Sequence, residues 1–425
     1  MKLLLCALAG VSLGLAQSHD AFVAKSVAAM EARLVETRRD FHRHPELSNQ
    51  EKRTGEVIAM RLRELGFEEV RTGVAGHGVV GVLKGAKPGA VVAWRADIDA
   101  LPIDESDFAV PYKSTVKGVK HACGHDAHIT VGLGLAEVLA LRKAELKGTV
   151  KLIFQPAEEG VSDVADAGAR LMVKEGVLEN PRPAAIFAFH ASPAVEVGKV
   201  AYAAGPLLAS VDSVDIVIKG KRAHGAFPED GVDAVVLAAQ CINMLQTIHS
   251  RRINTVEPSV LSIGVIKGGD RHNVTAGEVR MEGTLRTFSE SVREAYRTYV
   301  KQTLTGCTAM SGGTFSVEWK EPSYPATINP EALVKVSLPG LERILGKENV
   351  MSTGPQMGAE DFSYFQREIP GVMFWLGVRN EARGITSGLH TADFDIDEAA
   401  LGVGVKAAAN LVLDYLERHA TSVSQ

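Results

Sequence analysis

The sequence lacks three features, and each absence excludes a class of protein. Only 4 of its 425 residues are cysteines, too few for a fold held together by a disulfide framework. Beyond the N-terminal segment, no stretch of the sequence approaches the roughly 20 apolar residues that a membrane-spanning helix needs. Lysine and arginine form no runs interleaved with aromatic residues, and the net charge is only −5. A nucleic-acid partner is therefore not expected.

The remaining composition is that of a globular protein with room for two domains. Of the 425 residues, 46% are hydrophobic and 23% are charged, which are ordinary proportions for a folded chain. We therefore expect small solutes, rather than nucleic acids or membranes, as its partners.

The first 16 residues have the pattern of a secretory signal peptide. One lysine precedes an apolar run at residues 3–15, and small residues stand before a cleavage point after Ala16. We therefore expect an exported protein, periplasmic or secreted. Export would leave three cysteines, Cys123, Cys241 and Cys307. Cys241 and Cys307 could form a bridge in an oxidising compartment, but we expect two buried free thiols.

The densest chemistry lies at residues 121–128, which read HACGHDAH. This segment holds one thiol, three imidazoles and a carboxylate, and a loop would let Cys123 and His125 reach one cation. The apolar pattern predicts a helix over residues 126–143, so the cluster would lie at a helix N-terminus. There the helix dipole lowers the pKa of a thiol and favours the thiolate that binds metal. The alternative, a buried cysteine among loop histidines, suits a lone cysteine better than this cluster.

Continuous apolar runs predict strands of a buried, mostly parallel sheet. Such runs occupy residues 90–94, 149–154 and 184–189. Acids or a histidine follow their ends: Asp97 and Asp99, Glu158 and Glu159, and His190. Because functional sites of open α/β sheets assemble at the carboxyl ends of the strands, we expect these side chains to meet.

A different order of elements begins near Ser210. The pattern predicts a β-α-β-β-α-β succession at residues 213–218, 231–248, 260–266, 278–286, 289–305 and 314–319. This is the order of ferredoxin-like domains. We therefore predict an α/β catalytic domain at residues 20–208 and 320–425, with an inserted ferredoxin-like α+β domain at residues 209–319. The inserted domain would serve as a lid or a dimerisation surface.

Six side chains are candidate metal ligands: Asp97, Cys123, His125, Glu159, His190 and His390. Their donors suffice for two divalent cations that share a bridging group. A thiolate among imidazoles favours Zn, Mn, Co or Ni over Mg or Ca. Because neighbouring side chains point different ways, one of Glu158 and Glu159 could bind metal while the other acts as general base. Two adjacent glutamates alone would more often form a solvated loop.

Several segments resemble those of one family: RADIDALP, HACGHDAH, QPAEEG, GKRAHGAFPEDGVDA, MGAEDFSYF and LHTADFDIDE. The family comprises dinuclear metallohydrolases, including N-acyl-amino-acid amidohydrolases (aminoacylases), hippurate hydrolases and auxin-conjugate hydrolases. The resemblance runs from about His42 to the C-terminal helix. It implies a zinc-exopeptidase-like catalytic domain with two divalent metal ions per subunit, and a homodimer formed through the inserted lid.

The resemblance also implies roles for individual residues. The residues that match the family's metal ligands are Cys123, His125, Glu159, His190 and His390. Glu158 matches its general base, and Asp99 matches an acid that orients the ligands. Lid residue His224 matches a histidine that stabilises the tetrahedral oxyanion in the partner subunit's site. The lid positions that match those holding the substrate carboxylate are Asn273 and Arg286. Asp97 stands where relatives with another ligand set carry a metal-binding histidine, and its role stays open.

The implied reaction is hydrolysis of the amide bond of an N-acyl amino acid, with a metal-activated water and Glu158 as the base. One alternative is an exported dipeptidase or carboxypeptidase that uses the same site. Another is a binding protein for amino-acid conjugates, against which the presence of Glu158 argues. The sequence departs from many relatives at Pro228-Glu229 and Thr275-Ala276, which flank the expected substrate pocket. The preferred acyl group and amino acid are therefore left open.

Overall fold

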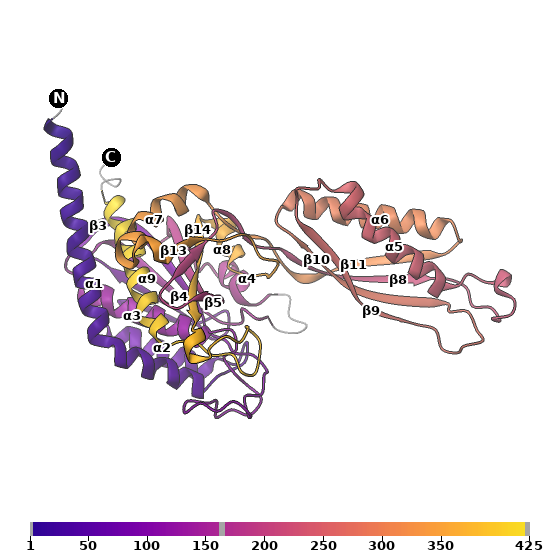
Figure 1. Cartoon of the computed structure of the whole chain (residues 1–425), viewed down its shortest axis with the longest axis horizontal. Coiled ribbons are helices and arrows are strands. Elements are labelled where there is room, and N and C mark those ends of the chain that lie inside the picture. The colour runs from indigo at the N-terminus through magenta and orange to yellow at the C-terminus, as the bar shows by residue number, and fades with distance from the viewer. Residues whose placement is uncertain (1–2, 161–165, 421–425) are drawn as a thin grey trace. The chain divides into compact units, whose positions relative to one another are not determined.

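The computed structural model describes residues 3–160 and 166–420, and the chain folds into two compact units (Figure 1). The larger unit comprises Met1–Gly205, Asn329–Gly354 and Tyr364–Gln425, and the smaller unit comprises Pro206–Ile328 and Pro355–Ser363.

The larger unit is built on an eight-stranded mixed sheet with the strand order β1-β2-β4-β3-β5-β14-β6-β13. Its strands are β1 (Glu69–Val74), β2 (Gly78–Lys84), β3 (Lys87–Asp97), β4 (Lys147–Gln155), β5 (Ala185–Glu196), β6 (Val200–Tyr202), β13 (Val350–Ser352) and β14 (Gly371–Arg379). The central strands β4, β3, β5 and β14 run parallel to one another, while β1 and β2 extend the sheet with antiparallel pairs. The three predicted apolar runs form β3, β4 and β5, and their large side chains, such as Trp94 and Phe154, are buried.

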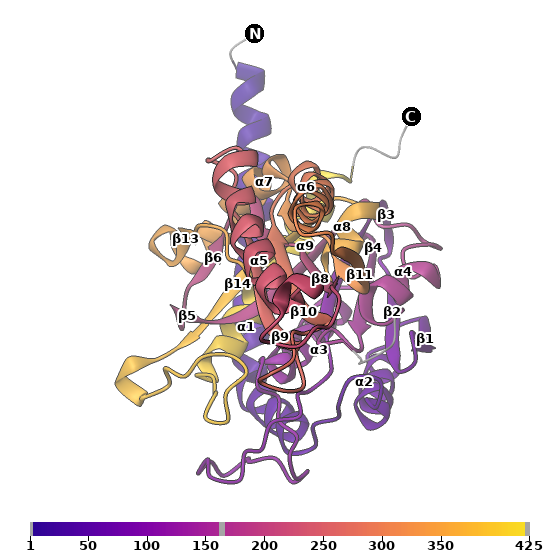
Figure 2. The ribbon, with the colours of Figure 1, turned by 90° about the vertical axis from the view of Figure 1, so that its right-hand side faces the viewer.

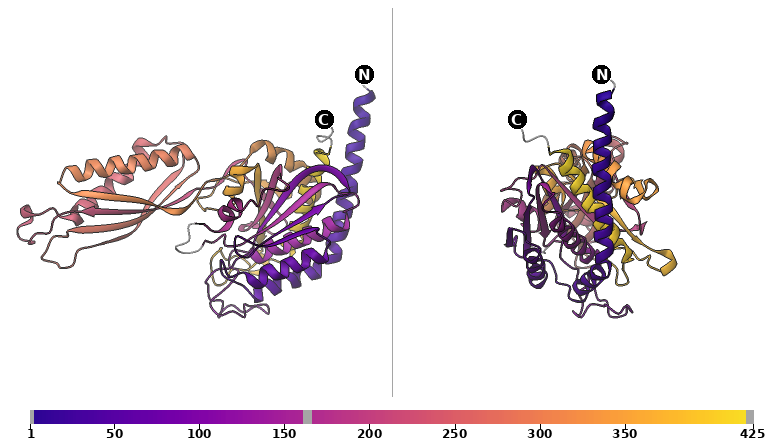
Figure 3. Two further views of the ribbon diagram at one scale, coloured as in Figure 1. Left: turned by 180° about the vertical axis from the view of Figure 1, so that it is seen from behind. Right: turned by 90° about the vertical axis from the view of Figure 1, so that its left-hand side faces the viewer.

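Helices cover this sheet and enclose the core. They are α1 (Leu3–Arg43), α2 (Lys52–Glu64), α3 (His125–Leu141), α4 (Gly168–Lys174), α7 (Glu331–Leu345), α8 (Ser363–Glu368) and α9 (Ala399–Arg418). Nearly every residue of α3 is buried, because α3 packs between the sheet, α9 and α1. Figure 3 shows α1, in indigo, lying across α9. Among the described residues, α9 is the helix long and apolar enough to cross a membrane, but 78% of its most apolar window is buried, as in a core helix.

The smaller unit has four antiparallel strands in the order β11-β8-β10-β9. These are β8 (Val211–Lys219), β9 (Ser259–Gly268), β10 (Glu278–Thr287) and β11 (Thr314–Tyr324). The helices α5 (Ala234–Arg252) and α6 (Glu290–Ala309) pack side by side on the sheet (Figures 1 and 2). This is the ferredoxin-like arrangement, so the predicted fold class is confirmed.

Short elements complete the chain. They are β7 (Gly205–Leu208) and β12 (Thr327–Asn329), which pair with each other, and the 3₁₀ turns η1 (Pro228–Asp230), η2 (Lys347–Asn349) and η3 (Glu381–Arg383).

The expectation of two free thiols in the smaller unit is wrong. Cys241 on α5 and Cys307 on α6 form a disulfide, with their Cα atoms 5.7 Å apart. The two cysteines are separated by 66 positions in the sequence, and they meet because α5 and α6 pack against the same sheet. Spacing alone could not show this. Cys123 is a free, buried cysteine.

Candidate active site

The five predicted ligands converge into two sets that share one sulfur. Ligand atoms of Cys123, His125 and His190 lie within 4.8 Å of one another, as do those of Cys123, Glu159 and His390. The Cys123 Sγ atom lies 3.5 Å from His190 Nε2 and 3.4 Å from His390 Nε2. Glu159 Oε1 lies 3.2 Å from the same His390 nitrogen. Two three-donor sets that share a thiol fit two cations bridged by one ligand.

Local backbone geometry brings these residues together. Gly124 stands between Cys123 and His125, and its φ of +88° lets the chain turn into α3. A side chain at this position would not fit, because its Cβ would lie 2.7 Å from the Cβ of Ala191. His390 also has a positive φ, +61°, and its N–H donates to the carbonyl oxygen of Ala122 at 2.8 Å. The HACGHDAH segment and the loop after β14 are thereby held against each other.

The position of His190 corrects one expectation. We predicted that this residue follows the end of its strand, but β5 continues to Glu196 because β14 pairs with it as far as Arg379. His190 therefore projects from within β5. It still reaches the cluster, because its Nε2 atom lies 3.5 Å from Cys123 Sγ.

Hydrogen bonds orient two of the imidazoles for metal binding. His125 Nδ1 lies 2.9 Å from the carbonyl oxygen of Asp99 and donates to it, and His190 Nδ1 donates to the carbonyl oxygen of Ala191 at 2.8 Å. Each ring therefore turns its Nε2 toward the donor cluster, the usual arrangement of metal-binding histidines. The Nε2 atom of His125 is buried and has no hydrogen-bond partner in the described part of the chain. A buried polar atom without a partner is costly, and a cation at the cluster would satisfy it.

The electrostatics also favour a cation. Burial lowers the pKa of His190 to about 3, helped by His128 and His125, so its Nε2 carries a free lone pair. Burial lowers the pKa of His125 too, but the carboxylates of Asp97, Asp99 and Glu159 outweigh burial and raise it to about 10. These acids therefore hold a positive charge at His125, which a metal ion can replace.

The environment of Cys123 differs from our expectation. Burial, together with the charges of Glu159 and Glu158, raises the pKa of the Cys123 thiol well above its ordinary value. The N-terminus of α3 does not outweigh these effects. The thiolate therefore needs a cation beside it, which again fits a metal ligand better than a redox thiol.

The adjacent glutamates converge rather than diverge. Glu158 Oε2 and Glu159 Oε1 both lie 3.9 Å from His125 Nε2, although neighbouring side chains were expected to point different ways. In the turn that follows β4, Ala157, which directly precedes Glu158, has a left-handed φ of +54°. Glu158 is 6% exposed, so its carboxylate borders the cluster in a largely dry environment.

Asp97 lies beside the ligand His125, with its Oδ2 atom 3.7 Å from His125 Nε2. Its carboxylate accepts hydrogen bonds from Arg95 Nη1 at 2.6 Å and from His128 Nδ1 at 2.5 Å, while His128 Nε2 accepts from the Ala191 N–H at 2.8 Å. Both nitrogens of His128 are thus engaged, so His128 is not free to bind a metal. His128 thus links Asp97 to the backbone of Ala191, a connection that sequence spacing did not reveal.

A second buried network was also missed from the sequence. Asp126 Oδ2 accepts from Arg38 Nε at 2.8 Å and from His42 Nδ1 at 2.7 Å, and Arg38 Nη2 donates to Asp395 Oδ1 at 2.9 Å. These contacts tie α1 to the start of α3 and to the segment after His390. His42 is 1% exposed, and its Nε2 atom lies 3.0 Å from Glu105 Oε1, so it belongs to this buried network. The sequence signal for this network was Asp126, which lies inside the HACGHDAH segment.

Three predicted site residues lie in the smaller unit. His224 is exposed, and its Nδ1 accepts from the Ala226 N–H at 3.1 Å. Asn273 lies beside it, because the Gly225 N–H donates to the Asn273 carbonyl oxygen at 2.8 Å. Arg286 projects from β10, and burial lowers its pKa despite the opposing charge of Asp212. The roles of these three residues remain predictions.

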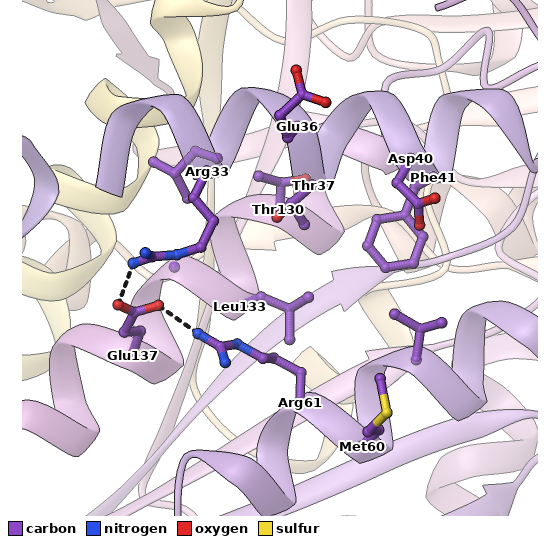
Figure 4. A pocket seen from close by; sticks show the side chains of 13 residues that line it. Arg33, Glu36, Thr37, Asp40, Phe41, Met60, Arg61, Thr130, Leu133 and Glu137 are labelled. Atoms are coloured by element: carbon purple, nitrogen blue, oxygen red, sulfur yellow. Dashed lines mark hydrogen bonds and ion pairs between the residues drawn. The ribbon is translucent and has the colours of Figure 1, made fainter. Parts of the chain in front are cut away.

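A cavity of about 310 Å³ lies between α1, α2 and α3, away from this cluster (Figure 4). Arg33 and Arg61 both pair with Glu137 at its edge, and Leu133 and Phe41 form part of its apolar wall. The residues that line it include none of the candidate ligands, so this cavity is not the metal site.

Comparisons relate this geometry to known proteins. The sequence model of peptidase family M20/M25/M40 matches residues 93–414. The N-acetylcysteine deacetylase of Bacillus subtilis is 39% identical over 389 residues, which cover 92% of this chain and 98% of that protein. Thermostable carboxypeptidase 2 of Saccharolobus solfataricus is 38% identical over 391 residues, which cover 92% and 97%. Among solved structures, a dinuclear metal-binding M20 peptidase, the YXEP protein of Bacillus subtilis, matches with a TM-score of 0.79 at 36% identity, covering 92% of this chain and 99% of its own.

Proposed function

Because this chain belongs to peptidase family M20/M25/M40 and is a hydrolase, we propose that it hydrolyses the amide bond of N-acyl amino acids with two divalent metal ions. The observation that carries the proposal is the pair of donor sets that share Cys123. The first set can be filled by Cys123, His125 and His190, and the second by Cys123, Glu159 and His390. Zn, Mn, Co and Ni suit this mixture of sulfur, nitrogen and oxygen.

The residues of the cluster divide the work. When bound, the ions would polarise the scissile carbonyl and acidify a water molecule. Glu158, whose Oε2 borders the cluster 3.9 Å from His125 Nε2, takes the proton of the attacking water and returns it to the leaving amine. Asp99 holds His125 through Nδ1 and keeps its Nε2 directed at the ligand cluster. By the family resemblance, we assign His224 to the oxyanion in the partner subunit's site, and Asn273 and Arg286 to the carboxylate of the substrate.

The test is release of free amino acid by the purified protein from N-acetyl and N-benzoyl amino acids and from dipeptides. Each substrate is assayed with added zinc or manganese and again with a chelator. We expect release from the N-acyl amino acids that the chelator abolishes. Release that resists the chelator, or no release from any substrate by metal-loaded protein, would contradict the proposal.

A second candidate is a carboxypeptidase or dipeptidase that uses the same residues. It is favoured by the thermostable carboxypeptidase 2, which is 38% identical to this chain. Both reactions cleave an amide beside a free carboxylate, so the metal cluster alone does not separate them. Release from dipeptides without release from N-acetyl or N-benzoyl amino acids would select this candidate.

Two further properties belong to the proposal. We propose a homodimer formed through the smaller unit, where the edge strand β9 exposes Val260 and Ile266. Sedimentation of the protein as a monomer would contradict it.

We also propose that the protein is exported after cleavage behind Ala16. The disulfide of the smaller unit suits an oxidising compartment, and the mass of the mature N-terminus in the exported fraction tests the cleavage.

A further inference from the structure

Glu51 is a buried acid that takes no part in the proposed reaction. It lies near the turn that carries Glu158 and Glu159. It occupies the N-cap position of α2, and its side chain makes no capping hydrogen bond. Glu51 Oε1 instead accepts from the Ala157 N–H at 2.8 Å, and the side chain is completely buried. Its carboxyl therefore bonds to the turn that carries Glu158 and Glu159, as well as to the backbone of Asn49 and of Glu51 itself.

Ala157 is a residue whose backbone needs such support. Its φ of +54° lies in the left-handed region, which residues with a Cβ adopt at a cost. This left-handed step brings the Glu158 and Glu159 carboxylates to the same distance, 3.9 Å, from His125 Nε2. A change to an ordinary φ at Ala157 would swing both carboxylates away from the cluster.

The turn is held by a carboxyl group at each end. Glu51 holds the Ala157 N–H at the entrance, and Asp99 Oδ2 accepts from the Glu159 N–H at 3.0 Å at the exit. Asp99 also accepts from Ser48 Oγ at 2.7 Å. The segment before α2 therefore supplies Glu51 at one end of the turn and contacts Asp99 at the other. Asp99 was singled out from the sequence, whereas Glu51 was not.

We propose that Glu51 is a positioning residue, which fixes the left-handed turn at Ala157 and thereby sets both the general base Glu158 and the ligand Glu159. The assignment of those two roles rests on the proposed function. Burial, with a smaller contribution from the charge of Asp99, raises the pKa of Glu51 to about 8. Glu51 is then mostly protonated at neutral pH, and a glutamine amide can replace its accepting oxygen.

The test compares Glu51→Ala, Glu51→Gln and the double variant Glu51→Ala/Ala157→Gly. Glu56→Ala, an exposed glutamate on the same helix, is the matched control. Each protein is assayed for kcat and KM with an N-acyl amino acid, for zinc affinity by calorimetry on metal-free protein, and for thermal unfolding. Because glycine adopts a positive φ without strain, the double variant needs less support from position 51.

For Glu51→Ala we expect kcat to fall about 10²-fold with little change in KM, and zinc affinity to fall about 10-fold because Glu159 is misplaced. Glu51→Gln and Glu56→Ala should stay within about 3-fold of wild type, and the double variant should regain about 10-fold in kcat. A folded Glu51→Ala protein with wild-type kcat and zinc affinity would overturn the proposal. A Glu51→Gln protein as impaired as Glu51→Ala would do so as well.

Two further measurements apply if Glu51→Ala does not fold or if the wild-type protein is inactive. If Glu51→Ala does not fold, Glu51→Asp replaces it, because the shorter side chain withdraws its oxygen from Ala157; wild-type kcat and zinc affinity in that variant would overturn the proposal. If wild-type protein hydrolyses none of the substrates, the proposed function fails. The zinc titrations of metal-free protein then still decide whether Glu51 positions Glu159.

Discussion

At the scale of single residues, Glu158 and Glu159 are adjacent, but only Glu159 belongs to a donor set that contains Cys123. Glu159 Oε1 lies 3.2 Å from His390 Nε2 within a donor set, whereas Glu158 is assigned the proton transfer. Glu158→Gln should therefore leave the metal content intact and lower kcat about 10²-fold or more, the usual contribution of a general base. Metal analysis and steady-state kinetics on one preparation check this, with Glu159→Gln as the matched variant that should lose metal. Unchanged turnover in Glu158→Gln would remove Glu158 from the role.

Cys123 is the residue common to both donor sets, so its loss should affect both ions. We expect Cys123→Ala to bind fewer than two zinc ions per chain and to lose activity. Its environment raises the pKa of the thiol, so deprotonation is linked to metal binding and releases a proton. Zinc titration in two buffers of different ionisation enthalpy measures that proton in the wild type. Full occupancy in Cys123→Ala would exclude the ligand assignment.

At the scale of elements, the start of α3 depends on the absence of a side chain at Gly124. A Cβ there would approach the Ala191 Cβ to 2.7 Å at a φ of +88°. Gly66, after α2, has a φ of +78° and no neighbour within 4 Å of such a Cβ, so it is the matched control. Gly66→Ala should lower the free energy of unfolding by about 1 kcal/mol from φ alone, and Gly124→Ala by about 3 kcal/mol. Equal losses in urea unfolding would show that the contact with Ala191 relaxes without cost.

The disulfide joins the two helices of the smaller unit. Cys241 and Cys307 lie 66 positions apart, and a cross-link of that length restricts the unfolded chain by up to about 4 kcal/mol in the loop-entropy estimate. Cys241→Ala/Cys307→Ala should therefore show faster amide exchange in α5 and α6, while α3 and α9 exchange as in the wild type. Hydrogen exchange followed by mass spectrometry measures both. Unchanged exchange in α5 and α6 would mean that the bridge adds no stability.

The same elements show what the sequence could and could not predict. The apolar pattern was enough to predict β3, β4 and α3. The β-α-β-β-α-β order was enough to predict the ferredoxin-like unit. The length of β5 was missed, because it depends on pairing with the distant β14. The hydrogen bond of Glu51 to Ala157 was missed too, because it spans 106 positions and follows no periodicity. Motif residues could thus be collected from the sequence, whereas the groups that hold them required the fold.

At the scale of the whole molecule, the donor cluster joins segments that are far apart in the larger unit. It draws on the start of α3, the turn after β4, the strand β5 and the loop before α9. An ion that binds the folded cluster and not the unfolded chain stabilises the fold by about 4 kcal/mol when its concentration is 1,000 times its Kd. Metal binding should therefore stabilise the larger unit and act through these four segments.

Removal of the metal ions should therefore change amide exchange mainly near the ligands. We expect a chelator to speed amide exchange around Cys123, Glu159 and His390, where the ligands stand on loops and helix ends. Exchange in β8 and β10 of the smaller unit should stay unchanged, because the two donor sets that share Cys123 contain no residue of that unit. Cys123→Ala protein, which should hold less metal, is the control in which the chelator has a smaller effect. If the chelator instead sped exchange equally in both units, or had the same effect on Cys123→Ala, the cluster would not be the site that holds the metal.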